Sequence, residues 1–250
     1  MKYLCFDLSG DMAMWRNPYE PVASFSTLGP APSQIAGLIG AALGFPAPWS
    51  QAAGSDIDKK SIKESQKKGL YWPVSPELLR WQDDNDYAVA CRWKGGIPSR
   101  IPWNVNGVKE LNKPFEDQPL RLQQQVVDNP LYQVLLRLKN TSAIEQTADA
   151  LCNPAFPLYL GASFCRAVVR NPEIRDTPPP LENGSQWAFW KESLTVGEIT
   201  PFSRHVVNDR EKGERIVTEG FWVYPTPMHP AEKKEEDTDP CLKGYCYLSD

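Results

Sequence analysis

The chain has 250 residues, of which 41% are hydrophobic and 11% aromatic, enough apolar material for a buried core in one large domain. Its formal net charge of −4 counts against an isolated nucleic-acid-binding protein, so any basic surface has to be local. The six cysteines are scattered without a CxxC pair, and no basic and apolar targeting or membrane segment opens the sequence, so we expect a cytoplasmic protein with reduced thiols.

The first part of the chain predicts a strand, a helix and a second strand. Residues 3–8 alternate as a strand does and stop at a Ser-Gly turn. A loop punctuated by prolines then leads into a helix over residues 33–44, with Ser33 as its N-cap. Residues 50–80 are polar and rich in lysine, which predicts an exposed insertion with at most one short helix, and residues 86–96 alternate as a strand.

The second part predicts a protruding hairpin, a strand, a helix and a mostly β C-terminal region. Turn formers fill residues 97–130, and residues 131–139 form a continuous β-rich run. Residues 142–152 carry apolar side chains at helical spacing. Three further strands are expected over residues 186–192, 202–208 and 215–224, before a charged tail.

The order of the predicted elements, β-α-β-β-α-β, is that of a ferredoxin-like α+β domain. The aromatic stacking motif that RNA-binding versions of this fold carry on their strands is absent from the sequence. The fold class therefore does not decide the function.

Three glycines stand in the predicted helix, at positions 37, 40 and 44, although each glycine in a helix costs roughly 1 kcal/mol relative to alanine. Ile35 and Leu38 belong to an apolar stripe that faces the core, and the glycines line the adjacent side. A side without side chains permits a close approach, by a neighbouring element of the protein or by a ligand backbone.

Little in the sequence carries catalytic chemistry. It contains no HExxH, Walker or GxSxG motif and no Cys–His cluster with metal spacing. The two histidines are His205 and His229, and a single histidine on a predicted strand, such as His205, is more often structural than catalytic. We therefore predict no cofactor, no metal site and no catalytic residue.

Three separated stretches, taken together, resemble one family: "FDLSGDMAMWRNPYEPVASFSTLGPAPSQIAGLIGAALG" (6–44), "DNPLYQVLLRLK" (128–139) and "FPLYLGASFCRAVV" (156–169). They are similar to the CRISPR-associated "Cas five" family, and most similar to its type I-B-like members. In type I Cascade complexes this subunit caps the 5′ end of the crRNA. The resemblance implies a ferredoxin-like (RRM-like) palm with an extended β-hairpin thumb and a small C-terminal β subdomain. On this sequence the palm spans residues 1–175 with the thumb at about 92–125, the C-terminal β subdomain 176–228, and the charged tail 229–250.

The same resemblance implies a non-catalytic subunit that holds the 5′ handle of the crRNA. Its partners would be the Cascade backbone subunit (Cas seven family) and large subunit (Cas eight family), with target DNA reached through the complex and no membrane. The handle site would combine the 15–27 loop, the start of the glycine-containing helix and the 161–166 turn, where backbone amides and small hydroxyls suit phosphate. The presumed thumb carries six basic and three acidic residues, which favours a phosphate-bearing partner. The candidate RNA-binding residues are Arg16, Ser24, Ser26, Ser33, Arg100, Trp103, Lys109, Lys113, Gly161, Ala162, Ser163 and Arg166.

Two other functions stay open. The type I-C branch of the family resembles metal-independent ribonucleases that cut precursor crRNA, and such chemistry needs an acid or base, typically a histidine, near a 2′-hydroxyl. No histidine precedes His205, so we expect a separate processing enzyme, with His205 as the runner-up catalyst. A scaffold that binds only protein is the third possibility, and the acidic pI of about 5.4 favours it.

Overall fold

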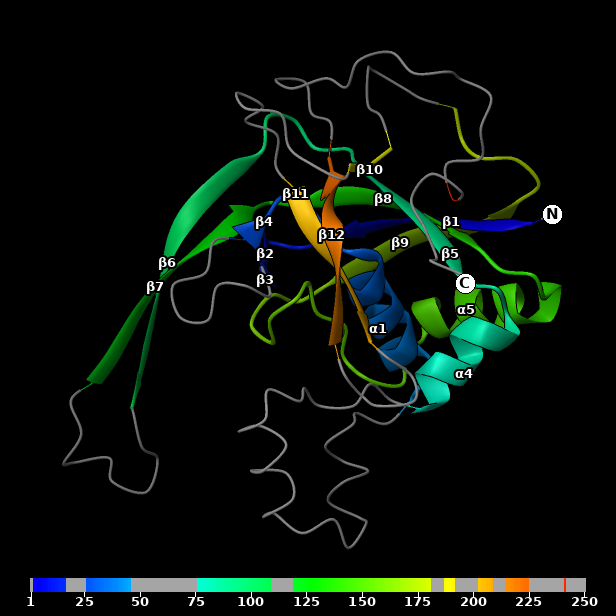
Figure 1. The fold of residues 1–250 in the computed structure, drawn as a ribbon, viewed down its shortest axis with the longest axis horizontal. Helices are drawn as coiled ribbons and strands as arrows, with labels where there is room; N and C mark the ends of the chain where they lie inside the picture. The colour runs from blue at the N-terminus through cyan, green and yellow to red at the C-terminus, as the bar shows by residue number, and fades with distance from the viewer. Residues whose placement is uncertain are drawn as a thin grey trace, which may run out of the picture.

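The chain folds around a four-stranded antiparallel sheet with the strand order β5-β8-β1-β9 (Figure 1). The structure is a computed structural model, and it describes residues 2–16, 26–45, 76–108, 119–180, 187–191, 202–208, 215–224 and 241. Helices α1 and α5 lie on the same side of the sheet (Figure 1). Along the chain these six elements are β1 (Tyr3–Ser9), α1 (Pro32–Ala42), β5 (Ala88–Trp93), β8 (Leu131–Arg137), α5 (Thr141–Cys152) and β9 (Val168–Arg175). The first five of these elements lie within a few residues of their predicted bounds. Strand β9 falls in a stretch for which the sequence predicted no strand, and the strand predicted over residues 186–192 is β10 of another sheet.

Helix α1 begins one residue earlier than predicted, and Ser33 is not its N-cap. The N-cap residue is Ala31, whose N–H donates to Oε1 of Gln34 over 2.8 Å. Pro32 occupies the first helical position, where its fixed φ suits the helix and its missing N–H costs nothing. Ser33 lies in the first turn with its side chain exposed, so the predicted cap is wrong. The helix start is stabilised instead by Pro32 at the first position and by the side chain of Gln34.

The three glycines of α1 have three different environments. A Cβ on Gly40 would lie 3.2 Å from Cδ1 of Leu78, so this glycine permits close helix packing. Gly44 has a φ of +80° and follows the C-cap Leu43, and the N–H of Phe45 donates to the carbonyl of Gly40, which makes a Schellman ending. Gly37 is exposed, and a Cβ there would meet no described atom within 4 Å. Close packing thus explains only Gly40.

The predicted insertion over residues 50–80 is wrong at its C-terminal end. Residues Pro76–Asp84 form helix α4, which packs beside α1 (Figure 1). Leu78 of α4 is buried against Gly40, and Trp81 lies edge-tilted against Tyr87. The polar composition hid this helix because it has few apolar residues, and these are covered by residues distant in the sequence or beyond its end. Residues 46–75 lie outside the described residues.

Three smaller sheets extend this framework. The predicted hairpin is a long antiparallel ribbon of β6 and β7, and it projects from one side of the molecule (left in Figure 1). The C-terminal strands form a separate sheet in the order β10-β12-β11. The ribbon consists of β6 (Ser99–Val108) and β7 (Pro119–Asp128), and the short strand β2 (Met12–Ala13) pairs with β7. Strand β3 (Trp15–Arg16) pairs with β4 (Ser26–Thr27). The C-terminal strands are β10 (Phe189–Lys191), β11 (Phe202–Asn208) and β12 (Arg215–Val223).

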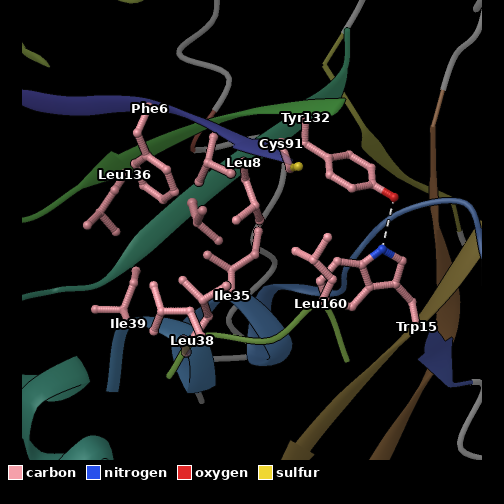
Figure 2. Close-up of a cluster of buried hydrophobic side chains, with 14 of the residues drawn as sticks. Phe6, Leu8, Trp15, Ile35, Leu38, Ile39, Cys91, Tyr132, Leu136 and Leu160 are labelled. Atoms are coloured by element: carbon pink, nitrogen blue, oxygen red, sulfur yellow. Dashed lines mark hydrogen bonds between the residues drawn. The ribbon is translucent and has the colours of Figure 1, made fainter. Parts of the chain in front are cut away.

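The central sheet has a buried core on each face. Even-numbered residues of β1, such as Phe6 and Leu8, point toward α1, where they meet Ile35 and Ile39 (Figure 2). Odd-numbered residues of β1 face the other way, where the second cluster comprises Tyr3, Cys5, Ala88, Ala90, Leu135 and Cys241. This strand is therefore buried on both faces, and part of the C-terminal tail returns to the sheet. Among the described residues, no helix combines the length and apolar character needed to cross a membrane.

Candidate nucleic-acid interface

Residues 26–32, which lead from β4 into α1 and are called the approach segment below, begin with a serine whose hydroxyl is fully engaged. Ser26 is 2% exposed, and its Oγ accepts from the N–H of Trp15 over 2.9 Å and donates to the carbonyl of Thr27 over 2.8 Å. Arg16 lies directly opposite Ser26 in the β3–β4 pair. Ser26 therefore contributes to the predicted site through its backbone and its position, since its side chain is occupied by the protein.

Tyrosine side chains from other elements hold the approach segment. The hydroxyl of Tyr132 donates to the carbonyl of Leu28 and accepts from Nε1 of Trp15 over 2.9 Å (Figure 2). The hydroxyl of Tyr224, which directly follows β12, donates to the carbonyl of Pro30. Two more carbonyls are capped in the same way, Gly29 by Oγ1 of Thr27 (3.0 Å) and Pro32 by the hydroxyl of Tyr87 (3.1 Å).

The buried position of these anchors also sets their protonation. Burial raises the pKa of both Tyr132 and Tyr224 well above the usual value of 10. Their hydroxyls are therefore neutral donors at any physiological pH. The approach segment is therefore a buried part of the protein that leads into α1, and protein side chains already bind its carbonyls. It is not an open loop.

Residues 156–166, called the turn segment below, contain the predicted "LGAS" turn and are largely exposed. Gly161 has a φ of +91°, and a Cβ there would lie only 2.0 Å from the carbonyl oxygen of Met14. The N–H of Met14 donates to the carbonyl of Leu160 over 2.9 Å, which fixes the turn segment to the chain just before β3. The missing side chain of Gly161 thus permits the approach of the protein's own backbone.

The remaining predicted residues of this turn have different exposures. Ala162 is half-buried and its carbonyl accepts from the N–H of Cys165 over 2.9 Å, whereas Ser163 is exposed. Burial raises the pKa of Cys165 to about 11, so its thiol is neutral. Arg166 is exposed and bridges to Tyr159 through the backbone. The turn segment therefore presents Ser163 and Arg166 to the outside.

The projecting β6–β7 ribbon contacts both segments. Nε of Arg100 donates to the carbonyl of Ser26 over 2.9 Å, and partial burial there lowers the pKa of this guanidinium below its usual value. The ring of Trp103 lies against the ring of Phe164, with centroids 5.9 Å apart and planes 13° apart. Ribbon, approach segment and turn segment consequently meet in one region.

The structure thus brings together most of the residues that the sequence predicted for one site. Arg16, Ser26, Arg100, Trp103 and the 161–166 turn are joined by the contacts just described. Ser33 is exposed on the first turn of α1, and none of the contacts just described involves it. Ser24, Lys109 and Lys113 lie outside the described residues.

Sequence reasoning missed the aromatic side chains of the turn segment. Phe156, Tyr159 and Phe164 are 47%, 38% and 41% exposed, and Trp103, which stacks on Phe164, is 37% exposed. Three aromatic residues within "FPLYLGASF" are the available signal, because a stretch rich in small residues and proline seldom buries them all. Trp103 and Phe164 lie near Arg100 and Arg166 in the chain, and exposed rings beside cations suit unpaired nucleotides.

Catalytic groups are sparse in the part of the chain that the structure describes. Within those ranges, no three side chains of His, Cys, Asp or Glu gather as metal ligands would. His205 lies on β11 between Arg204 and Val206, where the pairing with β12 shifts its register. Such bulges occur often beside active sites, so this position is the one that an alternative catalytic function would use.

Comparisons with known proteins relate most of the chain to one family. A family model described as "CRISPR-associated protein (Cas_Cas5)" matches residues 3–226. A chain of a solved "CRISPR RNA-guided surveillance complex" is similar over 97% of this chain and 98% of its own, with a TM-score of 0.52 and 14% identity, which shows a shared fold.

Two further solved structures are similar with TM-scores below 0.5, and no curated protein matches the sequence. A CRISPR protein from Archaeoglobus fulgidus has a TM-score of 0.42 and 10% identity over 95% of this chain and 88% of its own. A chain of a type III-B Cmr-beta complex bound to cognate target RNA and AMPPnP has a TM-score of 0.43 and 9% identity over 89% and 86%.

Proposed function

Because the chain belongs to the CRISPR-associated protein (Cas_Cas5) family, we propose that it is the crRNA-binding subunit of a type I Cascade surveillance complex in the cytoplasm. It holds the 5′ handle of the crRNA and contacts the backbone subunit (Cas seven family) and the large subunit (Cas eight family), in a complex of type I-B-like character. The observation that carries this proposal is the joining of the ribbon to the palm through Arg100–Ser26 and Trp103–Phe164. These contacts gather cations and exposed rings from separate segments on one surface.

In this proposal the central sheet with α1 and α5 is a ferredoxin-like palm, and the β6–β7 ribbon is the thumb. The strand order β5-β8-β1-β9 supports this assignment, because a split β-α-β-β-α-β unit places its first and third strands in the centre. The β10–β12 sheet is the C-terminal subdomain. Its anchor Tyr224 helps to shape the handle site by holding the approach segment.

The exposed cations supply the affinity for phosphate. Arg100 is held beside β4 by its hydrogen bond to Ser26, and Arg166 follows the aromatic turn segment. Arginine keeps its charge at any physiological pH and can bind phosphate through two N–H groups at once. Gly161 and Ser26 act indirectly, since their close contacts with Met14 and Trp15 place the surrounding backbone.

We further propose that the chain has no nuclease activity and that another enzyme processes the precursor crRNA. The chain has no histidine before His205, while the proposed RNA surface lies on residues that precede it. The alternative is metal-independent cleavage by His205, which the register shift of β11 favours. Incubation with repeat-containing precursor RNA separates the two, because only the alternative expects specific cleavage that His205→Ala abolishes.

The binding function is tested with the full chain and a single-stranded RNA that carries the CRISPR repeat, over a salt series. Replacing Arg100 and Arg166 by alanine weakens binding and lowers the salt slope by about 0.7 for each phosphate that the variant no longer neutralises. Arg80→Ala is the matched control, since Arg80 is an exposed arginine on α4 that pairs with Glu77. Wild-type protein that does not bind the RNA, or equal slopes for all three proteins, would overturn the proposal.

A further inference from the structure

Trp103 of β6 and Phe164 of the turn segment form a preassembled aromatic stack on the surface. Their planes differ by 13° and their centroids are 5.9 Å apart, yet each side chain keeps more than a third of its surface exposed. Aromatic pairs in proteins are either offset-stacked, as here, or edge to face, as Trp93 and Tyr132 are in the core. Two parallel rings that remain exposed offer a flat aromatic face rather than a pocket.

The charge around the aromatic stack indicates what it binds. The two stretches that supply the rings, residues 95–108 and 150–172, contain Arg100, Arg166 and Arg170 and not one carboxylate, in a chain whose net charge is −4. A protein hot-spot residue such as tryptophan or arginine is best held in a pocket, whereas a nucleobase is flat and its backbone is anionic. The chemistry therefore favours a single-stranded nucleic acid over a protein partner.

A buried amide beside the aromatic stack supplies a second, independent observation. Gln124 lies directly opposite Trp103 in the β6–β7 pair, so both side chains are on the same face of the ribbon. Gln124 is 4% exposed, and its Oε1 has no hydrogen-bond partner among the residues that the structure describes. A buried acceptor without a donor is unfavourable, and a ligand that brings an N–H would satisfy it.

We propose that Trp103 and Phe164 hold one unpaired base of the bound RNA as a third aromatic layer, and that Oε1 of Gln124 accepts a hydrogen bond from an amino group on the edge of that base. This inference rests on the proposed function and defines one subsite within it. The rings supply affinity that tolerates any base, because every base has a π face. Gln124 adds a preference for bases that carry an amino group, such as adenine.

The experiment compares three short single-stranded RNAs with the same number of phosphates: oligoadenylate, an abasic RNA, and an oligomer of purine riboside, which lacks the amino group of adenine. We expect Trp103→Ala and Phe164→Ala each to weaken oligoadenylate binding by about 5- to 100-fold, since stacking on one ring contributes that much. Binding of the abasic RNA stays as in the wild type. Gln124→Leu removes the preference for oligoadenylate over the purine riboside oligomer.

The matched control is Phe156→Ala, which removes an equally exposed ring from the turn segment outside the stack and leaves the binding of all three RNAs unchanged. Thermal unfolding of each variant shows whether it is folded. Wild type that binds none of these RNAs or the repeat RNA overturns the proposed function itself. Wild type that binds them while the Trp103 and Phe164 variants keep the same ratio of oligoadenylate to abasic affinity overturns only the base subsite. Variants that bind RNA normally but lose co-purification with the other Cascade subunits would show that the stack docks protein.

Discussion

The approach segment and the turn segment are both rich in small residues, and the sequence suggests the same role for both, yet the structure gives them opposite surroundings. Residues 26–32 are buried, and Tyr87, Tyr132 and Tyr224 satisfy three of their carbonyls. Residues 156–166 are mostly exposed and carry Phe164 against Trp103. Small residues therefore allow a close approach, but they do not tell whether protein or solvent lies beside them. The approach segment is buried because tyrosines distant in the sequence cover it.

The largest effect is expected at Gly161, where the turn segment meets the backbone of Met14. Gly161→Ala places a Cβ 2.0 Å from the carbonyl oxygen of Met14 at a φ of +91°, so backbone has to move. We expect a loss of about 3 kcal/mol or more in the free energy of unfolding, measured in denaturant. Gly37→Ala is the control, because it meets open space in a helix and should stabilise by about 1 kcal/mol. Equal effects of the two variants would show that the turn segment moves freely away from Met14.

The next largest effect tests the anchoring of the approach segment. Tyr132→Phe leaves both the carbonyl of Leu28 and Nε1 of Trp15 without their buried partner, which should cost about 2–4 kcal/mol. Tyr224→Phe removes the donor to the carbonyl of Pro30 and a weak partner of the Cys91 thiol, and should cost about half as much. Denaturant unfolding measures both. If the two losses are equal, the bond from Trp15 contributes nothing and the ranking is wrong.

High pH should destabilise the surroundings of Tyr224, which holds the approach segment. Burial raises the pKa of the Cys91 thiol to about 12 from 9.0, and a hydrogen bond links this thiol to Tyr224. Because the folded pKa lies above the unfolded one, the unfolded state loses its proton first, so stability is complete below pH 9 and falls as the pH rises further. The loss reaches about 1.4 kcal/mol per pH unit for this one thiol.

Measuring the free energy of unfolding between pH 9 and the onset of unfolding tests this, with Cys91→Ala as the variant. The variant should show a shallower fall than the wild type, whatever its stability at neutral pH. Cys152→Ala is the control, since Cys152 is exposed. Parallel pH profiles for wild type and Cys91→Ala would contradict the prediction.

The smallest effects compare one serine from each segment. Ser26→Ala removes the acceptor of the Trp15 N–H and should cost about 1–2 kcal/mol. Ser163→Ala changes an exposed side chain and should stay within about 0.5 kcal/mol of the wild type. Thermal unfolding of the pair is sufficient. A larger loss for Ser163→Ala would mean that the turn segment, too, is held by its side chains.

Much of the fold follows from local pattern, and the exceptions have physical reasons. Strands such as β1 and β8 are predicted because alternation and proline punctuation are local properties. Helix α4 is missed because Leu78 acquires its importance only by contact with Gly40 of another helix. The Ser33 cap is wrong because Pro32 and Gln34 offered an equally good start that residue preferences rank lower.

In the candidate site, too, the sequence indicates individual residues but not the partners that they meet in the fold. The residue types of Arg100, Trp103 and Gly161 indicate that they matter, and the structure brings them together. Their partners could not be predicted, since Phe164 and Gln124 meet Trp103 only through tertiary packing and strand register. The roles of the predicted residues toward RNA stay predictions for the experiments above.

The hydrogen bond between Tyr224 and Pro30 joins residues 194 positions apart, and this has a consequence for synthesis of the chain. The ribosome releases Pro30 early and Tyr224 near the end, so the entry to α1 cannot close until β12 has been made. A translation product that stops before Tyr224 retains every strand of the central sheet but leaves Gly29 without the ring that covers it. Full-length translation is thereby a condition for a correctly shaped site, and truncated copies would enter assembly with a loosened one.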